Sequence, residues 1–326
     1  MSREVSKKLS YLYFLMTAMV IGLHSVSVNS LGFFGISKDF NSYVRVFYDA
    51  ATGSFFFFSA FLLFRKEHKY TELLKRKIYS LLIPYLIFNI IAFLYKDVLR
   101  ELVLYHSLSQ YDVKELFYKI LLSTANPPLW FMRVLIEFVI IYPIIRMILN
   151  NEILAGGGII LTVILHLLIG VNVGYSTVQY WMPLYLMGAT FGKNYENQFC
   201  ISKKIKTLIS VIVFFILIFL AKESDVIFYF YRLVSPILMW YIFDFFKKFP
   251  SPRWWIKCTV FYYGMHILVI SPVAKTYKLF LGQNIIALFL AHIIVPAICI
   301  TLLAVIAMIV RKFIPEIWKI MIGGRS

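Results

Sequence analysis

Long runs of apolar residues recur along the whole chain, separated by shorter polar segments. A helix needs about 20 residues to cross a bilayer, and the runs come close to that length. They also lack the period-two alternation of membrane-spanning strands. We therefore predict an all-α, polytopic membrane protein with about ten transmembrane helices. The predicted spans are 10–30, 44–64, 78–95, 129–149, 157–172, 179–192, 207–221, 226–245, 258–274 and 284–310.

The composition agrees with this prediction. Hydrophobic residues make up 61% of the 326 residues and charged residues only 15%, which lies outside the range of soluble domains. The basic-then-apolar start resembles a signal peptide, but no small-residue cleavage site follows it, so we predict an uncleaved first span. The longest polar stretch, 96–128, is only loop-sized. We predict one integral membrane domain, 1–326, without a separate soluble domain.

The formal net charge of +17 would suit a nucleic-acid partner, but the basic residues are distributed along the chain as in a membrane protein. If the amino terminus is cytoplasmic, about two thirds of the lysine and arginine residues fall on the cytoplasmic side, as the positive-inside bias requires. We predict that both termini are cytoplasmic, that the lipid bilayer is a partner and that nucleic acid is not. The three cysteines show no disulfide or metal spacing, so no metal site is expected.

Two ionisable residues interrupt the apolar run 130–145, where each charge costs at least about 2.5–3.5 kcal/mol. Arg133 and Glu137 are spaced i, i+4, and Trp130 lies one turn earlier, so all three share one helical face. That face can line a polar cavity. Alternatively, the arginine and the glutamate neutralise each other as an intrahelical ion pair, which their spacing also permits.

Histidines at membrane depth add a second kind of chemistry. His24 and His266 fall inside predicted spans, and a histidine can exchange a proton near neutral pH. Such residues suit either group transfer or a proton-coupled carrier, and the residues alone leave both functions open. For His166 and His292 we expect contacts between helices, made by hydrogen bonds.

Five segments, in the same order along the chain, resemble the acyltransferase-3 family of integral membrane O-acyltransferases. They are AMVIGLHS with His24, GSFFFFSAFLLF, KRKIYSLLIPYLIFN with Arg76 and Asn89, PPLWFMR with Trp130 and Arg133, and TVFYYGMH with Tyr263 and His266. Three positions depart from the family pattern. Ala60 stands where glycine is usual, and Ser10 and Tyr13 stand where the first span of the family often has an aspartate and an arginine.

The resemblance implies an enzyme that moves an acyl group from acyl-CoA to a hydroxyl of a cell-envelope glycan or glycolipid. The acyl group is expected to be acetyl, which makes the protein an O-acetyltransferase. Acyl-CoA is expected to be a co-substrate, with no tightly bound cofactor, and the location a bacterial-type plasma membrane with multiple passes. The alternative is a proton-coupled transporter or flippase of an envelope glycan precursor, for which the two halves of the chain show no inverted repeat.

The implied reaction needs a base for the hydroxyl proton and a positive group near the thioester oxygen. The resemblance puts His24 in the first role, with His266 as the next candidate, and Arg133 in the second. Glu137 would hold the arginine or a histidine in place. Substrate contacts are expected from four further side chains, which are Arg76, Asn89, Trp130 and Tyr263.

Overall fold

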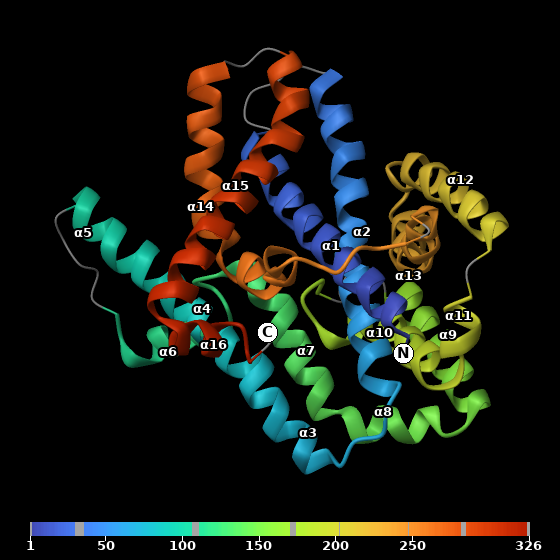
Figure 1. Ribbon diagram of the computed structural model, residues 1–326. Helices are drawn as coiled ribbons and strands as arrows, with labels where there is room; N and C mark the ends of the chain where they lie inside the picture. Colours follow the sequence, from blue (N-terminus) through green and yellow to red (C-terminus); the bar gives the residue numbers. More distant parts are fainter. Residues whose placement is uncertain are drawn as a thin grey trace. The chain divides into compact units, whose positions relative to one another are not determined.

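The computed structural model describes residues 2–29, 36–105, 111–169, 174–201, 203–246, 248–281 and 285–324. Within these ranges the chain is helical and contains no strand (Figure 1). The helices form two compact units. Unit 1 comprises Met1–His68 and Ile141–Lys257, and unit 2 comprises Lys69–Ile140 and Cys258–Ser326. Each unit therefore combines an early part of the chain with a late one.

Unit 1 is organised around α2, which packs against α1, α10, α12 and α13. Its aromatic stretch is completely enclosed, since Phe56, Phe57, Phe58 and Phe61 are all 0% exposed. A helix that is apolar on every side is expected to be covered on every side. The elements are α1 (Arg3–Asn29), α2 (Ile36–Phe64), α8 (Tyr142–Leu149), α9 (Glu152–Ile169), α10 (Val178–Asn194), α11 (Glu196–Phe199), α12 (Lys204–Ala221), α13 (Asp225–Ile242), η5 (Phe243–Phe245) and η6 (Trp254–Lys257).

Two glycines let α10 approach the backbone of α2. A Cβ atom on Gly188 would lie 2.8 Å from the carbonyl carbon of Phe57, and one on Gly192 would lie 3.0 Å from that of Phe61. Both distances are shorter than an ordinary contact between carbon atoms. Small residues spaced by four are a common way for membrane helices to pack closely. The GATFG stretch therefore sets the spacing of the central helix pair in unit 1.

Unit 2 begins with a long helical run, Tyr70–Val103, that is apolar enough to cross a membrane. Two π-helical segments, η1 and η2, interrupt its regular hydrogen bonding, and η1 ends two residues before Pro84, which has no N–H to donate. The elements are α3 (Tyr70–Lys77), η1 (Ile78–Leu82), α4 (Ile83–Phe93), η2 (Leu94–Leu99), α5 (Arg100–Tyr105), α6 (Val113–Leu121), η3 (Pro127–Leu129), α7 (Trp130–Ile140), α14 (Thr259–Leu281), α15 (Ile285–Phe313) and α16 (Pro315–Met321).

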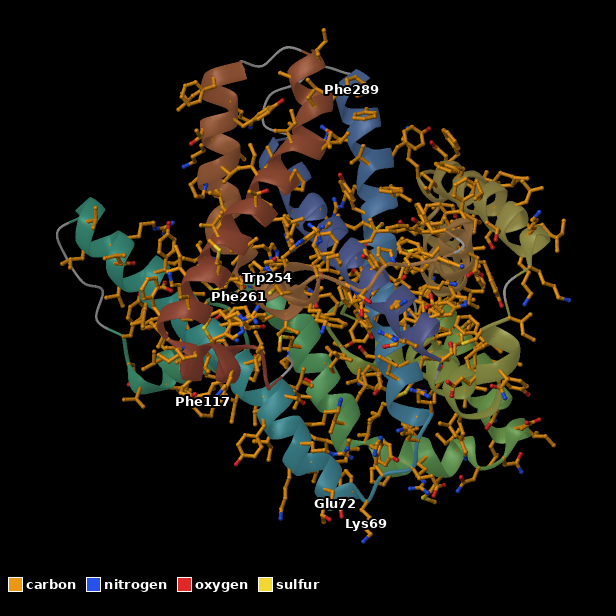
Figure 2. The ribbon with its side chains drawn as sticks, in the orientation of Figure 1. Lys69, Glu72, Phe117, Trp254, Phe261 and Phe289 are labelled. Carbon is orange, nitrogen blue, oxygen red and sulfur yellow. The ribbon has the colours of Figure 1, made fainter. Side chains whose placement is uncertain are left out.

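The last helices of unit 2, α15 and α16, pack together, and both contact α14. Helices α14 and α15 run side by side (Figure 1), and α15 buries every fourth residue along one stripe, namely Ala287, Ala291, Val295, Cys299, Leu303 and Ala307. Helix α16 packs against α15 and α4. Its Trp318 ring lies 5.2 Å from the ring of Phe261, which Figure 2 labels on α14. Helix α16 thus also contacts α14 through this ring pair.

Among the residues that the structure describes, five helical runs are long and apolar enough to cross a membrane, and they are Phe40–Phe64, Tyr70–Val103, Lys204–Ala221, Asp225–Phe245 and Phe289–Phe313. A sixth arises if Tyr142–Leu149 and Glu152–Leu168, bent by 120°, count as one span. The prediction of an all-helical membrane protein is confirmed in this coarser form. Ten spans with cytoplasmic termini stay a prediction, and the span ends at 30, 170–172 and 284 lie outside the described residues.

The predicted span 129–149 is wrong as a single helix. Helix α7 ends at Ile140, and α8 begins at Tyr142 after Ile141 has left the helical conformation, with φ −87° and ψ 9°. Pro143 in the first turn of α8 cannot donate a backbone hydrogen bond to the preceding turn. The polar stretch 96–128 also contains helices, including α6, whose Phe117 is 62% exposed (Figure 2). Hydropathy alone detected neither the break at Ile141 nor the helices within 96–128.

Candidate functional site

The eight candidate residues are divided between the two units. His24 lies half-buried on α1 in unit 1. The other seven belong to unit 2, and they are Arg76 on α3, Asn89 on α4, Trp130, Arg133 and Glu137 on α7, and Tyr263 and His266 on α14. Arg76 is exposed on the short helix α3, which contains Glu72 and which Lys69 precedes; Figure 2 labels both of these residues. The more enclosed candidates of unit 2 therefore come from three helices, α4, α7 and α14.

The arginine and the glutamate of α7 form the ion pair that their spacing permits. Arg133 Nε lies 3.5 Å from Glu137 Oε1, and the two side chains are 25% and 42% exposed. On the same helix Val134 and Phe138 are 0% exposed. The pair therefore lies on a less covered face of α7. This geometry fits both the self-neutralising pair and the wall of a polar site.

His266 has a defined tautomer. Its side chain is 0% exposed, and Nδ1 lies 2.7 Å from the backbone oxygen of Tyr263, one turn earlier on α14. A carbonyl oxygen only accepts hydrogen bonds, so Nδ1 carries the proton. In the neutral ring Nε2 then holds the lone pair and can accept a proton or a hydrogen bond. The arrangement suits a base or an acceptor for a substrate O–H or N–H group.

Aromatic rings connect the start of α7 to α14. The Phe131 ring lies 5.8 Å from the Tyr263 ring in an edge-to-face arrangement, and the Trp130 ring is perpendicular to that of Phe131 at 6.4 Å. The hydroxyl of Tyr263 donates to the backbone oxygen of Pro128. Tyr263 thus contacts the N-terminal end of α7 and the turn before it, through its ring and its hydroxyl respectively.

Asn89 is fully buried in α4, at 0% exposure. Its Nδ2 donates to the backbone oxygen of Tyr85 at 2.9 Å, and its Oδ1 has no hydrogen-bond partner among the described residues. A buried acceptor without a hydrogen-bond partner costs about 1–3 kcal/mol of stability. Asn89 therefore offers an acceptor that a substrate donor would satisfy.

The sequence reading missed Asn126, which lies in the turn between α6 and η3 and is 0% exposed. Its Nδ2 donates to Gly264 O of α14 at 2.9 Å and to Phe88 O of α4 at 3.4 Å. The same turn contains Ser123, the one non-glycine residue with positive φ (55°) in the described chain. The sequence signal was an asparagine directly before two prolines between apolar runs, which is typical of a fixed turn.

Unit 1 has a charged centre of its own, which joins Arg232 on α13 to Asp49 on α2. Arg232 Nε lies 2.5 Å from Asp49 Oδ2, and the guanidinium also donates to the hydroxyl of Tyr180. Tyr175 donates to the other carboxylate oxygen at 3.2 Å. The half-buried arginine and the buried aspartate thus neutralise each other between the helices.

His166 and His292 are the other two histidines for which contacts between helices were expected. The His166 ring of α9 stacks on Tyr229 of α13 with ring centres 3.8 Å apart, and it meets Tyr180 of α10 edge-on at 4.7 Å. His166 therefore contacts two other helices through its ring, whereas the hydrogen bond expected of it is not made by Nδ1, which has no partner among the described residues. His292 is 3% exposed on α15. Within the described ranges no three histidine, cysteine or acidic side chains gather in a way that could hold a metal ion.

The apolar helices, together with a histidine of fixed tautomer, an arginine–glutamate pair and buried amides inside them, define a multi-pass membrane protein with a polar site. The family described as an acyltransferase domain matches residues 8–311. The chain belongs to this acyltransferase-3 family, as the five segments indicated. No curated protein and no solved structure matches it. Family membership makes the protein a membrane acyltransferase and does not favour the transporter alternative.

Proposed function

We propose that this membrane acyltransferase moves an acetyl group from acetyl-CoA to a hydroxyl of a cell-envelope glycan or glycolipid, in a bacterial-type plasma membrane. Acyl transfer itself follows from the family. The observation that carries the proposal further is the His266 ring, whose Nδ1 is held by Tyr263 O at 2.7 Å so that Nε2 is left to accept a proton. Arg133 belongs to the same unit and supplies the positive charge that the reaction needs.

In the proposed step the hydroxyl oxygen attacks the thioester carbonyl carbon while a histidine takes the hydroxyl proton. The carbonyl oxygen becomes negative, and the guanidinium of Arg133, held by Glu137, stabilises that charge. The C–S bond then breaks, and CoA leaves as a thiol with the proton that the histidine returns. Further substrate contacts are proposed for Arg76, Asn89, Trp130 and Tyr263.

Two histidines compete for the role of base, because one hydroxyl proton needs one base. The segment AMVIGLHS supports His24, and the fixed tautomer supports His266. Glutamine at either position distinguishes the roles, since its Oε1 accepts a hydrogen bond but takes no proton at neutral pH. At the base, glutamine should lower kcat by a factor on the order of 10² or more. At a histidine that only binds substrate, glutamine should mainly change KM.

Purified protein in nanodiscs, matched for amount and thermal stability, is the material for these kinetics. His292→Gln is the control and should stay active, because the family-like segments do not contain that residue. If neither His24→Gln nor His266→Gln lowers kcat tenfold, catalysis by a histidine base is wrong.

Acetyl transfer is tested directly with labelled acetyl-CoA. Membranes from cells that carry the gene should place the label on envelope glycan or glycolipid, whereas membranes from cells that lack it should not. Mass spectrometry of the glycan then identifies the acyl group and the modified sugar. Absence of label with acetyl-CoA but incorporation from another acyl-CoA would correct the acyl group. Equal labelling in both membranes would contradict the proposed function.

A further inference from the structure

The turn that contains Asn126 joins the three helices that hold the enclosed candidates of unit 2. Through its Nδ2 it binds Gly264 O of α14 and Phe88 O of α4, and three residues further on Leu129 N donates to its backbone oxygen at 3.0 Å. Helix α7 starts at the next residue, Trp130. The side chain of Asn126 is thus hydrogen-bonded to two helices, and its backbone oxygen to η3, which leads directly into the third helix.

The carbonyl that Asn126 binds is directly beside the catalytic candidates of α14. Gly264 follows Tyr263, whose backbone oxygen holds the ring of His266, and Tyr263 also donates through its hydroxyl to Pro128 O in the same turn. Two hydrogen bonds, one accepted by Gly264 O and one donated by the Tyr263 hydroxyl, therefore fix this helical turn to the segment 126–128. A shift of the turn would move the His266 ring with it.

The packing leaves this part of α14 little freedom to move. A Cβ atom on Gly264 would lie 2.5 Å from Cγ of Phe88, so the backbone of α14 lies against the Phe88 ring. Ser123, earlier in the turn, has a left-handed φ of 55°, which costs a non-glycine residue on the order of 1–3 kcal/mol and is found where the surroundings fix the backbone. Lys96 adds a hydrogen bond to Ala125 O at 3.3 Å.

We propose that Asn126 is a positioning residue for acyl transfer, holding Tyr263 and His266 in register with the start of α7. This inference rests on the proposed function. It assigns no contact with substrate to Asn126, which acts on the reaction through the backbone of α14. Misplacement of a catalytic group by about 1 Å can lower a rate by roughly 10²-fold. Loss of both Nδ2 hydrogen bonds should therefore lower kcat more than it lowers the folded fraction.

The first test does not need activity. Hydrogen exchange of the protein in nanodiscs, followed by mass spectrometry, is compared for wild type, Asn126→Ala and the control Thr124→Ala, which changes an exposed residue of the same turn. We expect exchange around residues 262–268 to become about tenfold faster in Asn126→Ala only. Unchanged exchange there would overturn the inference, and so would an equal rise in every helix, because Asn126 would then be a general stability residue.

The second test is a double-mutant cycle with His266→Gln. If Asn126 acts through His266, Asn126→Ala should lower kcat roughly 10–100-fold in the wild type but less than about threefold in the His266→Gln background. Equal losses in both backgrounds would overturn the inference. If Asn126→Ala does not fold, Asn126→Ser, which keeps one donor, replaces it in both tests. Failure of the wild type to transfer acetyl would contradict the proposed function, while the exchange result would still decide whether Asn126 positions α14.

Discussion

Substitution of Gly188 by alanine is the sharpest test of the helix packing in unit 1. The added Cβ atom would lie 2.8 Å from the carbonyl carbon of Phe57 on α2, whereas carbon atoms in contact are ordinarily about 3.5–4.0 Å apart. The two helices must therefore separate locally by about 1 Å. A gap of that size forfeits a quarter to a half of the contact energy along the seam, and overpacking of this kind costs roughly 1–3 kcal/mol.

The matched control is Gly157→Ala on α9, where a Cβ atom would meet nothing within 4 Å. Alanine is the better helix former by about 1 kcal/mol, so this variant should be as stable as the wild type or slightly more so. Both variants gain the same helix propensity, so this gain cancels when their stabilities are compared. What remains is the cost of forcing α10 away from α2.

The readout is a thermal unfolding curve in nanodiscs, followed by labelling of Cys200, a free cysteine of unit 1. Burial raises the pKa of the Cys200 thiol to about 11, so it should react slowly until unit 1 opens. We expect Gly188→Ala to shift the labelling midpoint down by a few degrees. Equal midpoints for Gly188→Ala and Gly157→Ala would refute the close approach of α10 and α2.

Three further predictions concern charges. Replacing Arg133 by Leu and Glu137 by Met together should leave insertion normal but abolish acyl transfer in the labelled acetyl-CoA assay; full activity would return the pair to a structural role. Asp49→Asn, which leaves the Arg232 charge without its carboxylate, should cost roughly 3–5 kcal/mol, whereas replacing both residues by apolar ones should recover much of this in the same thermal assay; equal losses would contradict a buried pair. A topology reporter fused after Lys69 should read cytoplasmic, and an external reading would overturn the predicted orientation.

The class of the protein could be predicted from the sequence because insertion in a bilayer depends on local composition. Runs such as 207–221 and 226–245 are apolar over enough residues to cross a membrane by themselves, and the structure has α12 and α13 there. The family was also readable, because its segments are short and contiguous. Residues on one segment could even be paired, as the 3.5 Å contact of Arg133 with Glu137 shows.

Contacts between distant segments could not be read in this way. Asp49 and Arg232 are 183 residues apart, and hydropathy contains no information about which buried charge meets which. The break at Ile141 was also missed, because an apolar run looks the same whether or not the helix continues through it.

Tertiary structure also decided which polar groups meet in unit 2, for the same reason. Asn126 appeared in the sequence as an ordinary turn residue, and its importance comes from two backbone carbonyls supplied by α4 and α14. The tautomer of His266 depends on how its ring is oriented toward Tyr263 O. Local sequence thus determined which segments become helices, because the apolar composition of a segment decides whether it forms a helix in lipid. Which polar groups meet was decided only when the helices packed, because a buried donor must find its acceptor on whatever backbone is adjacent.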